Sequence, residues 1–170
     1  MSGKLNIEIF EASSVDEKEI LRNLLALYLH DLSEFTADLD INERGFFEYE
    51  GLNMYYQKET LSPLLYKVDG EYAGFILFNE PPYAPEDVDY NINEFFLLRK
   101  YRGKGIAQEV TKELFRQYPG RYMILQLVAN TPAIKFWHKV YRNSNLEYTE
   151  TEKIYDGLDC ILQKVEIPSL

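Results

Sequence analysis

A glycine-rich loop gives this sequence its clearest chemical signal. The stretch 91–117 begins with an apolar run, becomes basic and glycine-rich, and ends with apolar residues at helical spacing. Backbone N–H groups at the start of a helix have no partner within the helix, and the helix dipole favours an anion there. Gly103 and Gly105 let the main chain approach an oxygen cluster closely, and Arg102 and Lys104 add positive charge. The stretch therefore predicts a strand, a phosphate-binding loop and a helix.

Two common fingerprints of glycine loops fail for this loop. The nucleoside-triphosphate loop requires Gly-x-x-x-x-Gly-Lys-Ser/Thr, and the loop does not read that way. The dinucleotide fingerprint requires a third glycine three residues after the second, and Gln108 stands at that position. These departures disfavour a protein that binds nucleotide phosphates.

The loop resembles the signature of the GNAT superfamily of acyl-CoA-dependent N-acetyltransferases, Gln/Arg-x-x-Gly-x-Gly/Ala, in Arg102, Gly103, Lys104, Gly105, Ile106 and Ala107. In that family the amides of the loop hold the pyrophosphate of coenzyme A. A second segment, one predicted strand later, is similar to the family's Asn-x-x-Ala-x-x-Phe/Leu-Tyr in Asn130, Ala133, Phe136 and Trp137. Along the chain the sequence also resembles a bacterial group of predicted acetyltransferases that share this Phe-Trp pair.

The remaining elements follow the order of the GNAT fold, so the resemblance covers nearly the whole chain. Ser14 and Glu17 predict a capping box that opens a helix, and Asp69-Gly70 predicts a tight hairpin turn. A loop and a short second helix are expected within 40–56. Helices are also expected over 106–117 and after Asn130, and strands over 5–10, 64–68, 71–78, 88–98, 122–128, 146–154 and 158–167. The resemblance implies an α/β (α+β) fold: a mixed, mostly antiparallel sheet of about seven strands, splayed between the fourth and fifth, with about four flanking helices.

Length and composition predict one domain over residues 1–170. Aromatic residues are abundant and charge is moderate, so disorder is not expected. The net charge of −10 argues against general nucleic-acid binding. The absence of a long apolar run and of a signal-peptide pattern predicts a cytoplasmic protein without a membrane partner. Cys160 is alone, and no cluster has metal-ligand spacing, so no metal is expected.

The resemblance implies a site for acetyl-CoA, which is the acyl donor in this family. Main-chain groups of Phe96, Leu97 and Leu98 are expected to pair with the pantetheine arm. The pyrophosphate is expected on the amides from Arg102 through Ala107. Asn130 is expected to face the pantetheine, with Phe136 packing nearby; Asn130 also has the residue type of a helix cap, and the two roles can coexist.

The catalytic groups are harder to predict. An alkyl ammonium has a pKa near ~10.4, so a base must take its proton before it attacks a thioester. Glu94 is the first choice for that base, directly or through water. Strand alternation places Asn93 and Phe95 on the opposite face from Glu94, and a bulge would change this. A strand amide near Leu97 is expected to stabilise the oxyanion.

The general acid departs from the family pattern. Many members have a tyrosine at the position of Trp137, whose indole donates a hydrogen bond but not a proton. Tyr141, one turn further along, is the nearest replacement, with a packing role as its alternative.

The predicted function is transfer of an acetyl group from acetyl-CoA to a primary amine by direct attack in a ternary complex. Acidic residues Asp31, Glu34 and Asp38, and the acidic aromatic segment 40–56, favour a small cationic acceptor; a solvated helix face is the plainer interpretation of the three acids. The alternative function is a catalytically silent CoA-binding sensor or scaffold. A homodimer is one option, because closing strands of this fold often pair between subunits.

Overall fold

The structure, a computed structural model, describes residues 3–170. Its strands form one mixed sheet in the order β1-β2-β3-β4-β5-β7-β6, in which β4 and β5 are parallel and all other neighbours are antiparallel. The strands are β1 (Ile7–Glu11), β2 (Leu61–Val68), β3 (Glu71–Asn79), β4 (Tyr90–Leu97), β5 (Gly120–Leu127), β6 (Tyr148–Tyr155) and β7 (Leu158–Ile167).

The helices are α1 (Val15–Leu32), α2 (Ile106–Gln117) and α3 (Thr131–Asn143), with 3₁₀-helices η1 (Leu52–Tyr56) and η2 (Arg99–Tyr101). About four flanking helices were predicted, and residues 3–170 contain three α-helices. The second expected helix is reduced to η1. Gly51 precedes it in a left-handed conformation, with φ 81°, which interrupts a helical path. Within the described chain, no helix is both long and apolar enough to cross a membrane.

Local signals in the sequence set the ends of the longer helices. The Ser14 hydroxyl accepts from the Glu17 N–H at 3.1 Å, and the Glu17 carboxylate accepts from the Ser14 N–H at 3.0 Å, so the predicted capping box is present. The Asn130 side chain caps α3, with Pro132 in the first turn where a missing N–H costs nothing. Because these caps are encoded within a few residues, the sequence predicts them well.

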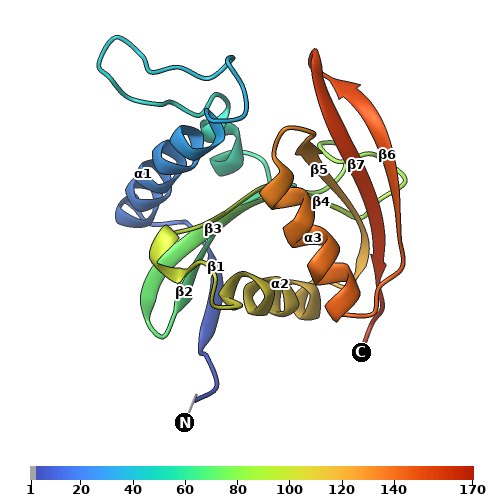
Figure 1. Ribbon diagram of the computed structural model, residues 1–170. Helices are drawn as coiled ribbons and strands as arrows, with labels where there is room; N and C mark the ends of the chain where they lie inside the picture. Colours follow the sequence, from blue (N-terminus) through green and yellow to red (C-terminus); the bar gives the residue numbers. More distant parts are fainter. Residues whose placement is uncertain (1–2) are drawn as a thin grey trace.

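The helices cover the two faces of the sheet unequally, as Figure 1 shows. α1 packs on one face through Leu21, Leu24 and Leu25, which join a cluster that includes Phe75 and Phe96 of the sheet. α2 and α3 pack on the other face, in the larger cluster built from Val110, Leu114, Trp137 and Tyr141 and the opposite side chains of the same strands. The strands at the centre of the sheet are therefore buried on both sides.

The sheet opens between β4 and β5. Their parallel pairing covers only Tyr90↔Tyr122, Asn91↔Met123 and Ile92↔Ile124, although β4 continues to Leu97. Beyond Ile92 the two strands diverge, which confirms the predicted splay. The second half of β4 thus has β3 on one edge and an unpaired edge on the other.

A β-bulge changes the side-chain pattern of β4 just where the splay begins. Leu77 pairs with Glu94 and Phe78 pairs with Ile92, which leaves Asn93 as an extra residue. Asn93 and Glu94 consequently both project toward the face that α1 covers, whereas Phe95 packs with α3 on the other face. Simple alternation had placed Asn93 opposite Glu94, and the bulge corrects that expectation.

Candidate functional site

A cleft of about 630 Å³ lies beside the open edge of β4. Four parts of the chain form its walls: the end of α1, the end of β4, the loop from η2 into α2, and the start of α3. Its lining includes Tyr28, Leu97, Arg102, Gly105, Asn130 and Trp137. The loop and the helix start that carry the glycine motif thus share one cavity with the splayed strand.

The glycine loop presents an uncapped helix start to this cleft. Gly103 and Gly105 have φ angles of 73° and 75°, in the left-handed region that side chains disfavour. Gly105 is the N-cap of α2 and supplies no side-chain hydrogen bond, so the amides of the first turn are available to an anion. A Cβ at either glycine would meet nothing within 4 Å, so backbone conformation rather than crowding requires glycine here.

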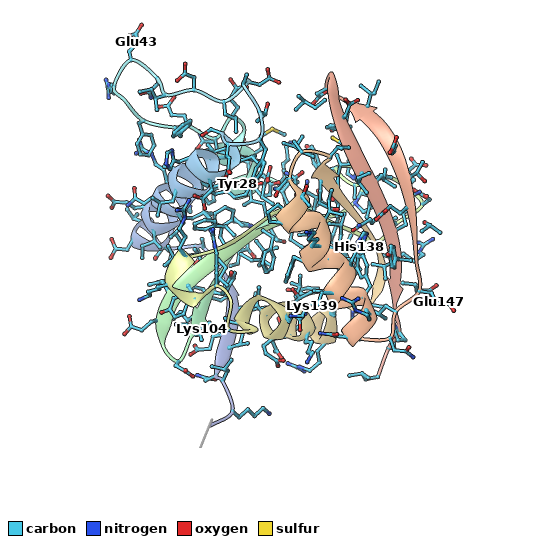
Figure 2. All side chains as sticks on the ribbon, in the orientation of Figure 1. Tyr28, Glu43, Lys104, His138, Lys139 and Glu147 are labelled. Carbon is cyan, nitrogen blue, oxygen red and sulfur yellow. The ribbon has the colours of Figure 1, made fainter. Side chains whose placement is uncertain are left out.

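Two arginines of this region are held by a carboxylate of α1. Asp31 accepts from Arg99 Nη2 at 2.6 Å and from Arg102 Nη2 at 2.7 Å. Partial burial opposes ionisation of Asp31, but the ion pairs with Arg102 and Arg99 hold its pKa below the ordinary value. Asp31 therefore does not belong to a purely solvated helix face. The Lys104 ammonium instead donates to the carbonyl of Lys100 at 2.8 Å, in the loop ahead of α2 (Figure 2).

Of the three residues predicted at the end of β4, Phe96 and Leu97 line the cleft, and Leu97 alone turns its main-chain groups toward the open edge. Leu98 donates its N–H to the Ala73 carbonyl of β3 at 2.8 Å. Because inward and outward groups alternate in an antiparallel pair, Phe96 also faces β3, while the N–H and C=O of Leu97 face the open edge. The Phe96 carbonyl accepts a further hydrogen bond from the Tyr66 hydroxyl at 2.5 Å. The Leu97 carbonyl accepts from Arg102 Nε at 2.7 Å.

The start of α3 brings Asn130 and an aromatic pair to the cleft. Asn130 Oδ1 accepts from the Ala133 N–H at 3.3 Å, which leaves the side-chain amide nitrogen for another partner. Phe136 stacks on Phe95 of β4 with ring centroids 5.7 Å apart. Trp137 lies next to it, 4% exposed and edge-on to Phe95. The predicted coenzyme residues of the glycine loop, of α3 and Leu97 are thus gathered in one place.

Tyr141 lies away from this cleft. It is fully buried, and its hydroxyl donates to Gln163 Oε1 at 2.8 Å. Burial, with the nearby Tyr148 and Glu150, raises its pKa. The cleft lining includes Trp137 but not Tyr141. Its role as general acid stays a prediction, and this placement favours the packing alternative.

Glu94 sits in a polar pocket between the bulge and α1. Its carboxylate accepts from the hydroxyl of Tyr28, on α1, through Oε2 and from the hydroxyl of Tyr49 through Oε1 at 3.1 Å. Burial raises the pKa of Glu94 to about 7, although both hydrogen bonds act in the opposite direction. A carboxylate with this pKa can take up a proton near neutral pH. Tyr28 lines the cleft and Glu94 does not.

Sequence reasoning missed the two tyrosines that hold Glu94. Tyr28 fits the apolar spacing of α1, which is typical of a core residue, and Tyr49 lies in a segment without regular structure. No local pattern connects either one to a carboxylate on a distant strand.

Among the described residues, no group of three or more His, Cys, Asp or Glu side chains is placed to hold a metal ion.

Comparison with known proteins places these features in context. The model of the acetyltransferase (GNAT) family matches residues 24–141. No curated protein sequence matches the chain.

Several solved structures share the fold. The ribosomal-protein-S18-alanine N-acetyltransferase from Escherichia coli aligns with a TM-score of 0.59 and 12% identity, over 97% of this chain and 96% of that one. An N-acetyltransferase from Staphylococcus aureus has a TM-score of 0.57 and 17% identity, over 96% and 99%. A candidate acetyltransferase from Salmonella typhimurium, solved with its cofactor acetyl-CoA, has a TM-score of 0.59 and 14% identity, over 96% and 95%. At these identities the likeness concerns the fold.

Proposed function

Because the chain belongs to the GNAT family of acetyltransferases, we propose that it transfers an acetyl group from acetyl-CoA to a primary amine, by direct attack in a ternary complex. The observation that carries the proposal is the single cleft that joins the uncapped start of α2 to the open edge of β4. A thioester on a long polar arm needs both parts: an anion site for its phosphates and a strand edge for its amides.

Each part of the cleft has a role in this proposal. The amides from Gly103 through Ala107 bind the pyrophosphate, because they lead into a helix start without a side-chain cap. The Arg102 N–H, also expected there, donates to the Arg99 carbonyl at 3.0 Å. Leu97 offers a C=O to the pantetheine arm, through the lone pair that Arg102 Nε does not use. The Asn130 amide and the ring of Phe136 contact the same arm from the α3 side of the cleft. The solved relative with acetyl-CoA supports this choice of donor.

The chemistry requires a proton acceptor and an oxyanion donor. Glu94 is the proton acceptor in this proposal, and its pKa of about 7 suits work at neutral pH. The Leu97 N–H faces the open edge and is the proposed donor to the oxyanion. Trp137 lines the cleft, but its indole has no transferable proton.

A small cationic amine is the proposed acceptor. The net charge of −10 and the cleft-lining carboxylate of Glu34 support a positively charged substrate. Trp137 at the position of the usual tyrosine favours the second candidate, a CoA-binding sensor or scaffold that does not turn over. Both candidates use the same coenzyme site, so binding alone does not separate them.

Calorimetric titration of acetyl-CoA tests the coenzyme site. The wild type is expected to bind acetyl-CoA at micromolar concentrations. Gly105→Asp places a carboxylate beside the proposed pyrophosphate site and is expected to abolish that binding. Gly157→Asp, on the β6–β7 turn, is a matched control, because its φ of 77° and its open surroundings impose the same backbone strain far from the cleft. No heat with the wild type, or equal loss in both variants, would contradict the assignment.

An assay for free CoA thiol over a panel of amines then separates enzyme from sensor. The enzyme predicts acceptor-dependent thiol release, highest with small cationic amines. Tight acetyl-CoA binding without thiol release for any amine would establish the sensor instead.

A further inference from the structure

Glu94 is not among the residues that line the cleft, and this poses a problem for a proton acceptor. The carboxylate lies behind α1, with each oxygen accepting a tyrosine hydroxyl. Of the two tyrosines, Tyr28 lines the cleft and Tyr49 does not. Figure 2 shows Tyr28 between α1 and the sheet. Its ring is fixed there by edge contacts with Phe75 and Phe96, at centroid distances of 5.6 Å and 6.0 Å.

The hydroxyl of Tyr49 has a second hydrogen-bond partner besides Glu94. It accepts from Asn93 Nδ2 at 3.1 Å, and the same amide donates to the Tyr55 hydroxyl at 3.1 Å. Tyr55 in turn donates to Asn79 Oδ1 at 2.7 Å. This chain of hydrogen bonds runs away from the cleft under η1. Of the two tyrosines that donate to Glu94, Tyr28 is therefore the one that lines the cavity.

We propose that Tyr28 is a catalytic residue that carries protons between the bound reactants and Glu94 in both directions. The proposal rests on the proposed acetyl transfer and adds the route of the proton. Glu94 acts through Tyr28 rather than on the substrate.

The steps balance once the acceptor ammonium has released one proton to solvent, so that the neutral amine enters the cycle. The amine nitrogen attacks the thioester carbonyl, a C–N bond forms, and the carbonyl electrons move to the oxygen. The nitrogen gives a proton to the Tyr28 oxygen as the Tyr28 proton passes to the Glu94 carboxylate. The intermediate then collapses, and the C–S bond breaks with its electron pair on sulfur. Tyr28 protonates the thiolate while Glu94 returns the proton to Tyr28, so both residues end as they began.

The environment of Tyr28 favours this coupled transfer over a free tyrosinate. Burial, followed by the charge and hydrogen bond of Glu94, raises the pKa of Tyr28 well above its ordinary value. The phenol therefore releases its proton only as another arrives. The groups facing Glu94 are Tyr28 from α1, Tyr49 from the segment before η1, and Tyr55 of η1 by way of Asn93.

The same relay explains how the reaction proceeds with tryptophan at position 137. Trp137 lines the cleft but has no proton to give, and Tyr141 is bonded to Gln163 outside it. A tyrosine that approaches the cleft from α1 replaces the missing acid from the opposite wall. One Tyr-Glu pair then supplies both the base and the acid.

Steady-state kinetics of three variants test the relay, with the acceptor that the amine panel identifies. Tyr28→Phe is expected to lower kcat by about 100-fold or more, the range of general acid–base catalysis, and to leave acetyl-CoA affinity within about twofold. Glu94→Gln is expected to behave similarly. Tyr49→Phe removes a hydrogen bond from the same carboxylate outside the cleft, so its kcat is expected to fall by less than about tenfold.

The pH profile of kcat separates a relay from a structural role. The wild type is expected to show a rising limb near pH 7, which is the pKa of Glu94. Tyr49→Phe is expected to move the limb to higher pH. The Tyr49 hydrogen bond lowers the pKa of Glu94 in the wild type, so its loss raises that pKa. Tyr28→Phe is expected to lose the limb altogether. A limb that persists in Tyr28→Phe, shifted upward with kcat largely retained, would show that Glu94 acts directly and would overturn the relay.

A ring-fluorinated tyrosine at position 28 guards against a folding defect. It keeps the shape of the phenol and makes it more acidic, so a changed kcat with unchanged thermal stability supports proton transfer through this hydroxyl. An unchanged kcat contradicts it.

If the wild type releases no thiol with any amine, the proposed transfer fails and the relay fails with it. An active wild type with an active Tyr28→Phe variant overturns the relay alone.

Discussion

Single residues set the proton affinity and the edge geometry of this site. Glu94 is a half-buried acid on β4, and its raised pKa follows from burial against two hydrogen bonds. Gly74 affects the geometry of the strand edge, because its missing side chain lets Tyr66 reach across β3 to the Phe96 carbonyl. Each makes a prediction that a single substitution tests.

Glu94→Gln is expected to change how stability depends on pH. The pKa of Glu94 is raised in the folded chain to about 7 from an ordinary 4.5, so its contribution to stability is full below pH 4.5 and is lost as pH rises toward 7. Tyr28, Tyr49 and Tyr55 face it and stay protonated in this window, because their pKa values are raised. Urea unfolding at pH 5 and pH 8 is expected to show a loss on the order of 2 kcal/mol in the wild type that Glu94→Gln lacks.

The control for this measurement is Glu48→Gln, an exposed neighbour of Tyr49. It is expected to follow the wild type at both pH values. Equal pH dependence in the wild type and in Glu94→Gln would show that the carboxylate is ionised as easily in the folded chain as in the unfolded one.

Gly74→Ala is expected to destabilise the chain by about 1–3 kcal/mol or more, as overpacking in a core does. The new Cβ would lie 1.9 Å from the Phe96 carbonyl oxygen and 2.3 Å from the Tyr66 hydroxyl, so β4 must shift. Adding Tyr66→Phe removes the hydroxyl contact but leaves the ring carbon Cζ 2.5 Å from the new Cβ, so the thermal stability is expected to recover only in small part. Full recovery in the double variant would place the conflict at the hydroxyl instead of at the strand.

At the scale of elements, the helix α1 contacts both halves of the site. Tyr28 and Asp31 lie one helical turn apart on it. Tyr28 contacts the acid of the β4 bulge, and Asp31 contacts both arginines beside the glycine loop. The helix therefore joins the proposed proton route to the proposed phosphate site.

Asp31→Asn is expected to tighten acetyl-CoA binding. The Asp31 carboxylate forms ion pairs with Arg99 and Arg102, and a phosphate that binds these arginines must displace it. Calorimetry is expected to show Kd falling several-fold, a change on the order of 1 kcal/mol. Glu34→Gln removes one negative charge from the same cleft without touching either arginine, so a smaller change is expected there. Weaker binding in Asp31→Asn would mean that Asp31 orients the arginines for the phosphate.

At the scale of the whole molecule, the acidic balance bears on the acceptor. A net charge of −10 gives a field that attracts cations over the range of the Debye length, about 30 Å at 0.01 M salt and about 10 Å at 0.1 M. The KM for a cationic acceptor is therefore expected to rise across this salt range. A neutral aromatic amine is the control, and an equal rise for both would remove electrostatic attraction as the reason for acceptor preference.

The sequence predicted the parts of this molecule that short-range signals encode. The capping box at Ser14, the turn at Asp69-Gly70 and the helix that begins after Gly105 all appear where expected. These features depend on residues within a few positions of one another.

Contacts between distant residues account for what the sequence did not predict. Tyr28 and Glu94 are 66 positions apart, and Asp31 and Arg102 are 71 apart, so no local period reports either pair. The bulge at Asn93 depends on register with β3 and reverses the face that alternation assigned to it. The placement of Tyr141 against Gln163 likewise depends on how α3 packs on β7.

The single turn of α1 between Tyr28 and Asp31 has a thermodynamic consequence. A helix turn is stiff, so a ligand that displaces Asp31 from the arginines also changes the setting of Tyr28 and of Glu94 behind it. Donor binding and proton uptake at the bulge are then linked equilibria, and linkage is reciprocal. Where donor binding moves Asp31, donor affinity is expected to shift slightly with pH through the titration of Glu94, and donor binding shifts the proton affinity of Glu94 by the same factor.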